Sequence, residues 1–122
     1  MKRLCLVVLF GLGLPTASWS QKAIDLRVRS AGDLAALCAA DPASAGADAK
    51  INFCHGFAQG AVDDKLRTVA DKKPFCFPNP TPSRASTLKE FVTWVRSMPA
   101  NHDLNAVDGL FKFMGERFPC KS

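Results

Sequence analysis

The sequence has none of the short motifs that mark the common catalytic and nucleotide-binding sites. It contains no glycine-rich phosphate loop, no G-x-S-x-G nucleophile turn and no H-E-x-x-H zinc motif. It also lacks any C-x-x-C pair, and structural zinc sites usually take their ligands from such closely spaced pairs. These absences argue against an enzyme and against a bound metal or other cofactor.

The chain also lacks a hydrophobic run long enough to cross a membrane. The apolar stretch over residues 4–14 is shorter than the ~20 residues of a spanning helix. It follows a positively charged N-terminus and precedes small residues up to Ser20, which is the pattern of a cleaved secretory signal. We therefore expect a signal peptide over 1–20 and one exported domain over 21–122, with no membrane segment after cleavage.

Strong charge of one sign is missing too. The whole chain has a net charge of +5, and the loss of Lys2 and Arg3 with the signal lowers it by two, to +3. Nucleic-acid-binding domains carry dense basic patches, which this mildly basic domain does not. An exported location argues in the same direction, so we expect no nucleic-acid partner.

Cysteine is the informative residue that is present. Four cysteines remain in the exported domain: Cys38, Cys54, Cys76 and Cys120. An even number behind a secretory signal predicts disulfides, because exported proteins mature in an oxidising compartment. Successive cysteines are 16, 22 and 44 positions apart, too far for zinc-ligand pairs. Each bridge would stabilise the fold by roughly 3–4 kcal/mol in the chain-entropy model.

Apolar residues recur at spacings of three and four along the domain, which predicts helices. Ser30 has the place of an N-cap, with Asp33 three positions later as in a capping box. This first helix should end before Pro42, and a second should run from about Asp48 to Val69.

The second helix contains two glycines four positions apart, Gly56 and Gly60. Glycine costs about 1 kcal/mol in a helix interior, so this pair predicts the close approach of another helix. Further along the chain, Thr81-Pro82 is the expected start of a third helix. Pro99 is expected to end it.

Asn101 or Asp103 is the expected N-cap of a fourth helix, which should stop at Pro119. The apolar stripes of the last two helices are Leu88, Phe91, Val92, Val95 and Met98, and then Leu104, Val107, Leu110, Phe111, Met114 and Phe118. Strand signals are weak after Arg29. The predicted fold class is therefore all-α, a small antiparallel bundle of about four helices stapled by two disulfides.

Helix order favours one of the three possible disulfide pairings. Cys38 ends the first helix, and Cys54 lies in the opening turns of the second, which should run back beside it. Cys76 follows the far end of the second helix, and Cys120 follows the fourth helix, which should finish at that same end. Pairing Cys38 with Cys54 and Cys76 with Cys120 therefore fits best.

Other candidate sites have simpler explanations. His55 adjoins Cys54, but neighbours on a helix point about 100° apart, so they form no nucleophile–base pair. The same divergence separates Asp63 from Asp64, and no third acidic ligand is close in sequence. His102 lies between two helices, where it is either a plain loop residue or a contact for a partner.

Several short stretches, taken in order, carry a resemblance to a known family. They are Cys38, Phe53-Cys54-x-Gly56-Phe57-x-x-Gly60-x-x-Asp63, Phe75-Cys76-x-Pro78, Val92-x-x-Val95-x-x-Met98-Pro99 and Phe118-Pro119-Cys120. From about Ser30 to Cys120 the chain resembles the Rap/Tai family, the immunity proteins of type VI secretion amidase effectors. It departs from the family at Phe57, where tyrosine is frequent, and in the turn after Pro78.

The resemblance implies a periplasmic helical protein without catalytic activity. Such a protein binds a peptidoglycan-cleaving amidase effector and blocks its active-site cleft. Binding in the family often uses a dimer with a protruding loop, so a homodimer is a further expectation. A periplasmic stress chaperone of the HdeA type is the alternative, although that class typically has one disulfide and this chain has four exported cysteines.

The link between the last two predicted helices is the expected contact with the partner. Loops held on a rigid scaffold are frequent recognition sites, and this link contains polar side chains next to a proline. We expect Asn101, His102 and Asp103 to contact the amidase. The alternative is a helix face formed by Lys89, Thr93 and Arg96.

Overall fold

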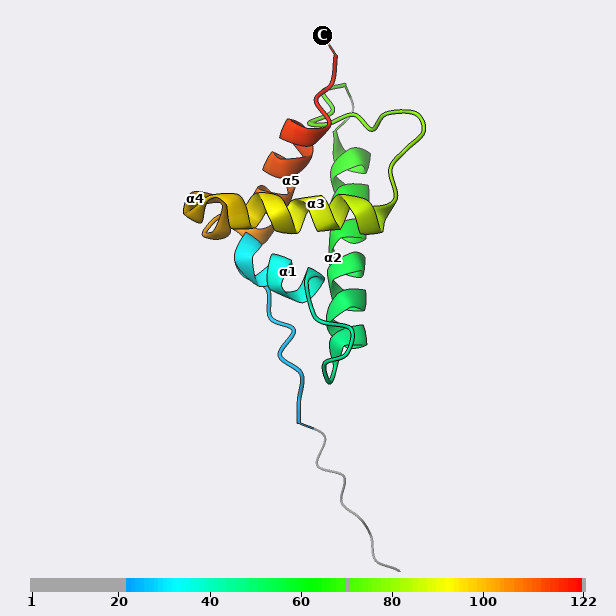
Figure 1. The fold of residues 1–122 in the computed structure, drawn as a ribbon. Helices are drawn as coiled ribbons and strands as arrows, with labels where there is room; N and C mark the ends of the chain where they lie inside the picture. Colours follow the sequence, from blue (N-terminus) through cyan, green and yellow to red (C-terminus); the bar gives the residue numbers. More distant parts are fainter. Residues whose placement is uncertain (1–21, 70, 122) are drawn as a thin grey trace, which may run out of the picture.

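A computed structural model describes residues 22–69 and 71–121, and these residues form five helices and no strand (Figure 1). The helices are α1 (Ala31–Cys38), α2 (Ala47–Thr68), α3 (Arg84–Ser97), α4 (Pro99–His102) and α5 (Ala106–Arg117). The signal peptide expected over residues 1–20 lies outside the described residues and stays a prediction. Within the described part of the chain, no helix is long and apolar enough to cross a membrane.

The N-terminal ends of the first two helices are where the sequence predicts them. The Ser30 hydroxyl accepts a hydrogen bond from the Asp33 N–H at 3.0 Å, and the Asp33 carboxylate accepts one from the Ser30 N–H at 2.9 Å. This is the predicted capping box, and it satisfies two backbone donors of the first turn. The second helix begins at Ala47, one residue before the expected Asp48.

Two other predicted helix starts are wrong. The third helix is capped by Ser83, whose hydroxyl accepts from the Ser86 N–H at 3.1 Å, and not by Thr81. The last long helix is capped by Asn105, whose side-chain oxygen accepts from the Val107 N–H at 3.1 Å. Neither Asn101 nor Asp103 caps it, because the chain forms the one-turn helix α4 over Pro99–His102 before α5 begins.

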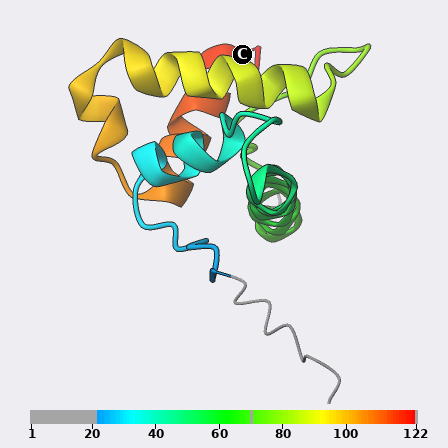
Figure 2. The same cartoon turned by 60° about the horizontal axis from the view of Figure 1, so that its bottom comes forward.

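The short helix α1 lies at the centre of the fold. It packs against α2, α3, α4 and α5, and its Leu34 is completely buried. Figures 1 and 2 show that α3 lies across α2 on one side of α1. A fully buried Phe91 on α3 meets Phe113 of α5 with ring centroids 5.6 Å apart. The sequence stripe of α5 had missed Phe113, although this side chain is buried.

Both disulfides join the predicted partners. Cys38 pairs with Cys54 across α1 and α2, with Cα atoms 5.2 Å apart. Cys76 pairs with Cys120 at a Cα separation of 4.8 Å, so this bridge joins the segment that follows α2 to the segment that follows α5. The Cys76 N–H also donates to the Phe118 carbonyl oxygen at 2.8 Å. The predicted all-α fold with two disulfides is therefore confirmed.

The close helix approach predicted at the two glycines of α2 is absent. A Cβ atom placed at Gly56 or at Gly60 would meet nothing within 4 Å. Both residues are exposed, because the core-facing side of α2 is formed by Ala47, Cys54 and Ala58 instead. The prediction was wrong because the spacing of glycines cannot tell a buried helix face from a free one.

Candidate functional site

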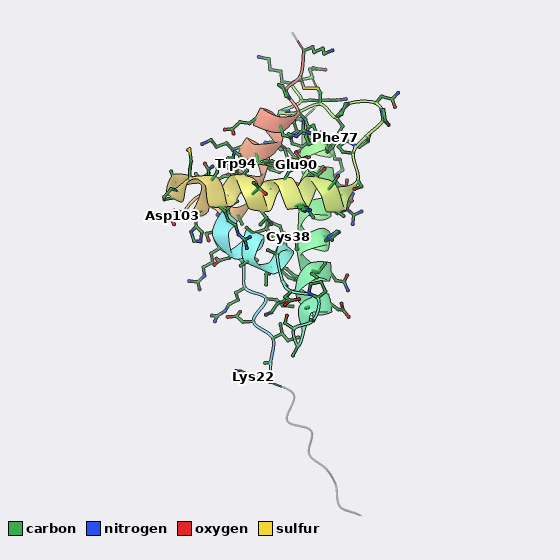
Figure 3. All side chains as sticks on the ribbon, viewed as in Figure 1. Lys22, Cys38, Phe77, Glu90, Trp94 and Asp103 are labelled. Carbon is green, nitrogen blue, oxygen red and sulfur yellow. A yellow bond between two sulfur atoms is a disulfide. The ribbon has the colours of Figure 1, made fainter. Side chains whose placement is uncertain are left out.

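The short helix α4 and the residues on either side of it form a corner of the fold where the chain passes from α3 to α5. We call residues 98–103 the α3–α4 corner. Helix α3 stops because Met98 adopts an extended conformation, with φ −143° and ψ 131°. Pro99 then begins α4. Proline suits this first position because the N–H that it lacks would have no partner within the helix. Figure 1 shows α4 at the far end of α3, and Figure 3 labels Asp103 there.

Asn101 holds this corner against α3 and is not a surface residue. Its side-chain amide donates to the carbonyl oxygen of Trp94 at 3.1 Å, and only 2% of the residue is exposed. Its Oδ1 atom is buried and has no hydrogen-bond partner. Of the three residues predicted to contact a partner, Asn101 is therefore held inside by the structure, and its side chain cannot reach a protein bound outside.

His102 and Asp103 are the two predicted contact residues that do face outward. The side chain of His102 is 60% exposed and that of Asp103 is 85% exposed, and the imidazole Nδ1 lies 3.1 Å from the carboxylate Oδ1. The His102 ring packs over Gly32 in the first turn of α1, where a Cβ atom would come within 2.2 Å of the ring. The lack of a side chain at Gly32 therefore allows this histidine its position.

Met98 adds an apolar tip to the same corner. Half of this residue is exposed, although the sequence stripe had placed it on the buried face of α3. That prediction was wrong because the helix ends one residue earlier, and the extended backbone turns the side chain outward. The corner thus combines an exposed thioether with an imidazole and a carboxylate, which is a mixed surface of the kind that protein partners bind.

The corner rests on a rigid base at the N-terminus of α1. The Ala31 N–H donates to the Leu104 carbonyl oxygen at 2.8 Å, and the Ala106 N–H donates to the Arg29 carbonyl oxygen at 3.0 Å. Backbone hydrogen bonds from the N–H groups of Ser30 and Arg29 hold the pKa of Asp33 below its usual value. The backbone hydrogen bonds fix the chain just after the exposed pair, and the hydrogen bond from Asn101 to Trp94 fixes it just before. Little order must therefore be gained on binding.

The alternative surface on α3 is also accessible. Lys89, Thr93 and Arg96 are all exposed. Beside them Trp94 is half-buried, and its indole N–H donates to the Glu116 carboxylate at 2.7 Å. This hydrogen bond and the ammonium of Lys112, 5.8 Å from the indole centroid, leave Trp94 anchored to α5. Trp94 is therefore part of the packing between α3 and α5.

The remaining polar candidates have local partners. The Asp63 carboxylate accepts from the Gln59 amide at 2.6 Å, and the Asp64 carboxylate accepts from the Arg67 guanidinium at 2.6 Å. Among residues 22–69 and 71–121, no group of three or more histidines, cysteines or acids could hold a metal ion. The adjacent aspartates are thus surface residues of α2 with side chains engaged along their own helix.

One concave surface was not foreseen from the sequence. A groove of about 260 Å³ lies between α2 and the start of α3, and most of its lining is apolar. It is lined by Val62, Leu66, Leu88, Leu110 and Met114, among others. None of the residues predicted to contact a partner lies in this groove.

Comparison with protein families decides the classification. Residues 30–120 match the model of the Rap1a immunity proteins, which covers most of the chain. The chain belongs to this family. The match begins at the capping residue of α1 and ends at the last cysteine, so it includes all five helices and both disulfides. The search of the curated proteins and the search of the solved structures gave no match.

Membership of the Rap1a family confirms the kind of protein that the sequence resemblance indicated. The chain is of the immunity type, and its two disulfides are those of a protein that matures in an oxidising compartment. The α3–α4 corner lies inside the matched region.

Proposed function

We propose that this Rap1a protein is a non-catalytic periplasmic inhibitor of a peptidoglycan-cleaving amidase effector, and that the α3–α4 corner blocks the cleft of that enzyme. The observation that carries the proposal is the exposed His102–Asp103 pair, in a corner that also exposes Met98 and that backbone hydrogen bonds hold to the start of α1. Family membership supports an effector as the partner. The signal expected over residues 1–20 would deliver the protein to the compartment where the effector acts.

The chemistry of the corner suits a narrow polar cleft. The imidazole of His102 can donate and accept hydrogen bonds, and the Asp103 carboxylate accepts them. Because both side chains are more than half exposed, they can reach into a concave surface without unfolding any helix. Asn101 has a different role in this proposal, since its hydrogen bond to Trp94 keeps the corner in place.

The test is inhibition of the amidase encoded beside this protein by the purified exported domain. Replacing His102 and Asp103 together by alanine should weaken inhibition by at least about tenfold, since central interface residues typically cost more than 1 kcal/mol each when truncated. Replacing Lys89 and Thr93 by alanine is the matched control, because both are exposed on α3. Melting curves should be unchanged for both variants.

A different pattern would redirect the proposal. If the Lys89 and Thr93 variant loses inhibition while the His102 and Asp103 variant keeps it, the contact lies on the face of α3. If the protein inhibits no co-encoded amidase but suppresses client aggregation at low pH, the chaperone function is supported instead.

We also propose that the protein self-associates as a homodimer. The expected exported domain has 102 residues, from 21 to 122. Besides the α3–α4 corner, it has a second exposed region on α2, around Gly56 and Gly60. A dimer formed away from the corner would display two corners to effectors. Sedimentation of the exported domain over a range of concentrations tests this part of the proposal.

A further inference from the structure

The groove between α2 and the start of α3, which we call the α2–α3 groove, has an apolar floor that reaches the core of the fold. Leu88, Leu110 and Met114 line it, and none of them is more than 4% exposed. Ala58 and Val62 line it from α2. Figures 1 and 2 show that α3 lies across α2, so the two helices diverge beside their crossing. The groove therefore opens onto apolar side chains that solvent barely reaches.

The segment that leads into α3 adds an aromatic edge to this groove. Phe77 is part of the lining, together with Thr81 and Pro82, and 36% of Phe77 is exposed. Its ring centroid lies 5.7 Å from that of Phe75 and 5.3 Å from that of Phe118, which are both buried. These contacts hold the ring in place. The exposed part of Phe77 therefore extends the apolar floor to the edge of the groove.

Two charged side chains line the groove, and they differ in what already binds them. Asp63 is on α2, and its carboxylate accepts a hydrogen bond from the Gln59 amide at 2.6 Å. Arg84 is the first residue of α3 and is exposed. None of the ion pairs within residues 22–69 and 71–121 involves its guanidinium. The groove therefore has a cation at its edge that is available to a ligand.

The size and the charge of the groove together define the ligand that fits it. Small-molecule sites are mostly apolar, with a few polar groups that fix the orientation of the ligand. At about 260 Å³ the groove is smaller than the ~300–1,000 Å³ of most such sites, which favours a narrow ligand. A guanidinium can pair with both oxygens of a carboxylate, so Arg84 suits a negatively charged end group. The complementary ligand is a single apolar chain that ends in one carboxylate.

We propose that the α2–α3 groove binds a medium-chain fatty acid, with the hydrocarbon chain along the apolar floor and the carboxylate at Arg84. Burial of the chain drives binding, because it removes apolar surface of both the ligand and the groove from water. The site is separate from the α3–α4 corner, since none of residues 98–103 lines the groove. Figure 3 labels Phe77 and Asp103 far apart on the molecule. Fatty-acid binding is therefore a second activity, independent of the proposed inhibition.

The first experiment tests the carboxylate site. Titration calorimetry of the exported domain with dodecanoate, below its micelle concentration, should show saturable one-to-one binding. Arg84→Gln should weaken this binding by about fivefold or more, because a charged hydrogen-bond donor is lost, and should leave the binding of uncharged dodecanol unchanged. Arg96→Gln is the matched control, since Arg96 is exposed on the same helix and does not line the groove.

The second experiment fills the groove. Val62→Phe should weaken the binding of dodecanoate and of dodecanol alike, by at least about tenfold, because the larger ring takes the place of the hydrocarbon chain. Val107→Phe is the matched control, since Val107 is also half-buried but lies on α5 outside the lining. Asp63→Asn should strengthen the binding of dodecanoate alone, because it removes a negative charge from the groove. Melting curves of the variants check that each is folded.

The outcomes separate this inference from the proposed inhibition. The absence of saturable binding of dodecanoate overturns the inference, and so does binding that neither Val62→Phe nor Arg84→Gln weakens. A protein that binds lauroyl lysophosphatidylglycerol but not dodecanoate overturns the fatty acid as the occupant. Inhibition of the amidase by the Val62→Phe variant should match that of the parent protein, which supports two independent sites.

Discussion

Removal of the Cys76–Cys120 disulfide gives the clearest test of what stabilises this fold. The bridge closes a loop between residues 44 positions apart. In the chain-entropy model, a loop of that length constrains the unfolded state by about 4 kcal/mol at 25 °C. Cys76 is half-buried and Cys120 is exposed, so two serines in their place bury little new polar surface. The loss of stability should therefore come mainly from the greater conformational freedom of the unfolded chain.

The measurement is urea and thermal unfolding of the exported domain with Cys76 and Cys120 both replaced by serine. A loss of about 4 kcal/mol corresponds to a fall in melting temperature of roughly 15–30 °C for a domain of about 100 residues. The dependence of the unfolding free energy on urea should steepen, because an unfolded chain without the cross-link exposes more surface. Intact mass before and after reduction checks that the parent protein has no free thiol.

The Cys38–Cys54 bridge is the matched comparison. Its loop spans 16 positions, so the same model assigns it about 3 kcal/mol and a smaller change in urea dependence. Cys54 is completely buried, and serine there adds the cost of burying a hydroxyl. The reasoning is refuted if the Cys76 and Cys120 variant melts with the parent protein, or if its stability falls with no change in urea dependence.

Two further predictions concern the core and the pH dependence of stability. Phe91→Ala should lower the free energy of unfolding in urea by about 3–5 kcal/mol, because this ring is fully buried against Phe113. Phe77→Ala should lower it much less, because Phe77 is partly exposed. Equal losses would contradict the packing described. The pKa of Asp33 is lower in the folded protein than in the unfolded chain, so the Asp33 carboxylate stabilises the fold near neutral pH. This stabilisation is lost as the pH falls below about 4 and through the folded pKa. Asp33→Asn should flatten this acid-side loss in urea midpoints measured from neutral to acid pH, and an unchanged acid profile would contradict the capping-box argument.

Some parts of the structure follow from local chemistry and could be predicted from the sequence. The capping box at Ser30 and Asp33 is a contact between residues three positions apart, so the sequence contains all of its parts. Both disulfides were also predictable from the order of the helices, which brings Cys54 beside the end of α1 and brings the segments after α2 and α5 to the same end of the fold. The existence of the long helices follows from the spacing of their apolar residues.

Other parts depend on contacts between residues far apart in the chain. The N-cap of α3 is a different case, because Thr81 and Ser83 both fit the local pattern, and the folded chain shows that Ser83 accepts the hydrogen bond from the Ser86 N–H. The sequence predicts Asn101 as a partner contact in a surface link, but the extra turn α4 directs it inward onto Trp94. The same turn exposes Met98, because the backbone changes conformation there.

By itself, the sequence determined an all-α domain with two defined disulfides, and it carried the motifs of its family. Only the tertiary structure decided which residues of the α3–α4 corner face outward. It also decided that Gly56 and Gly60 lie on an uncovered face of α2. The physical reason is that helix periodicity and caps are set by neighbours in sequence. Which face of a helix is buried is set by the other helices that pack against it.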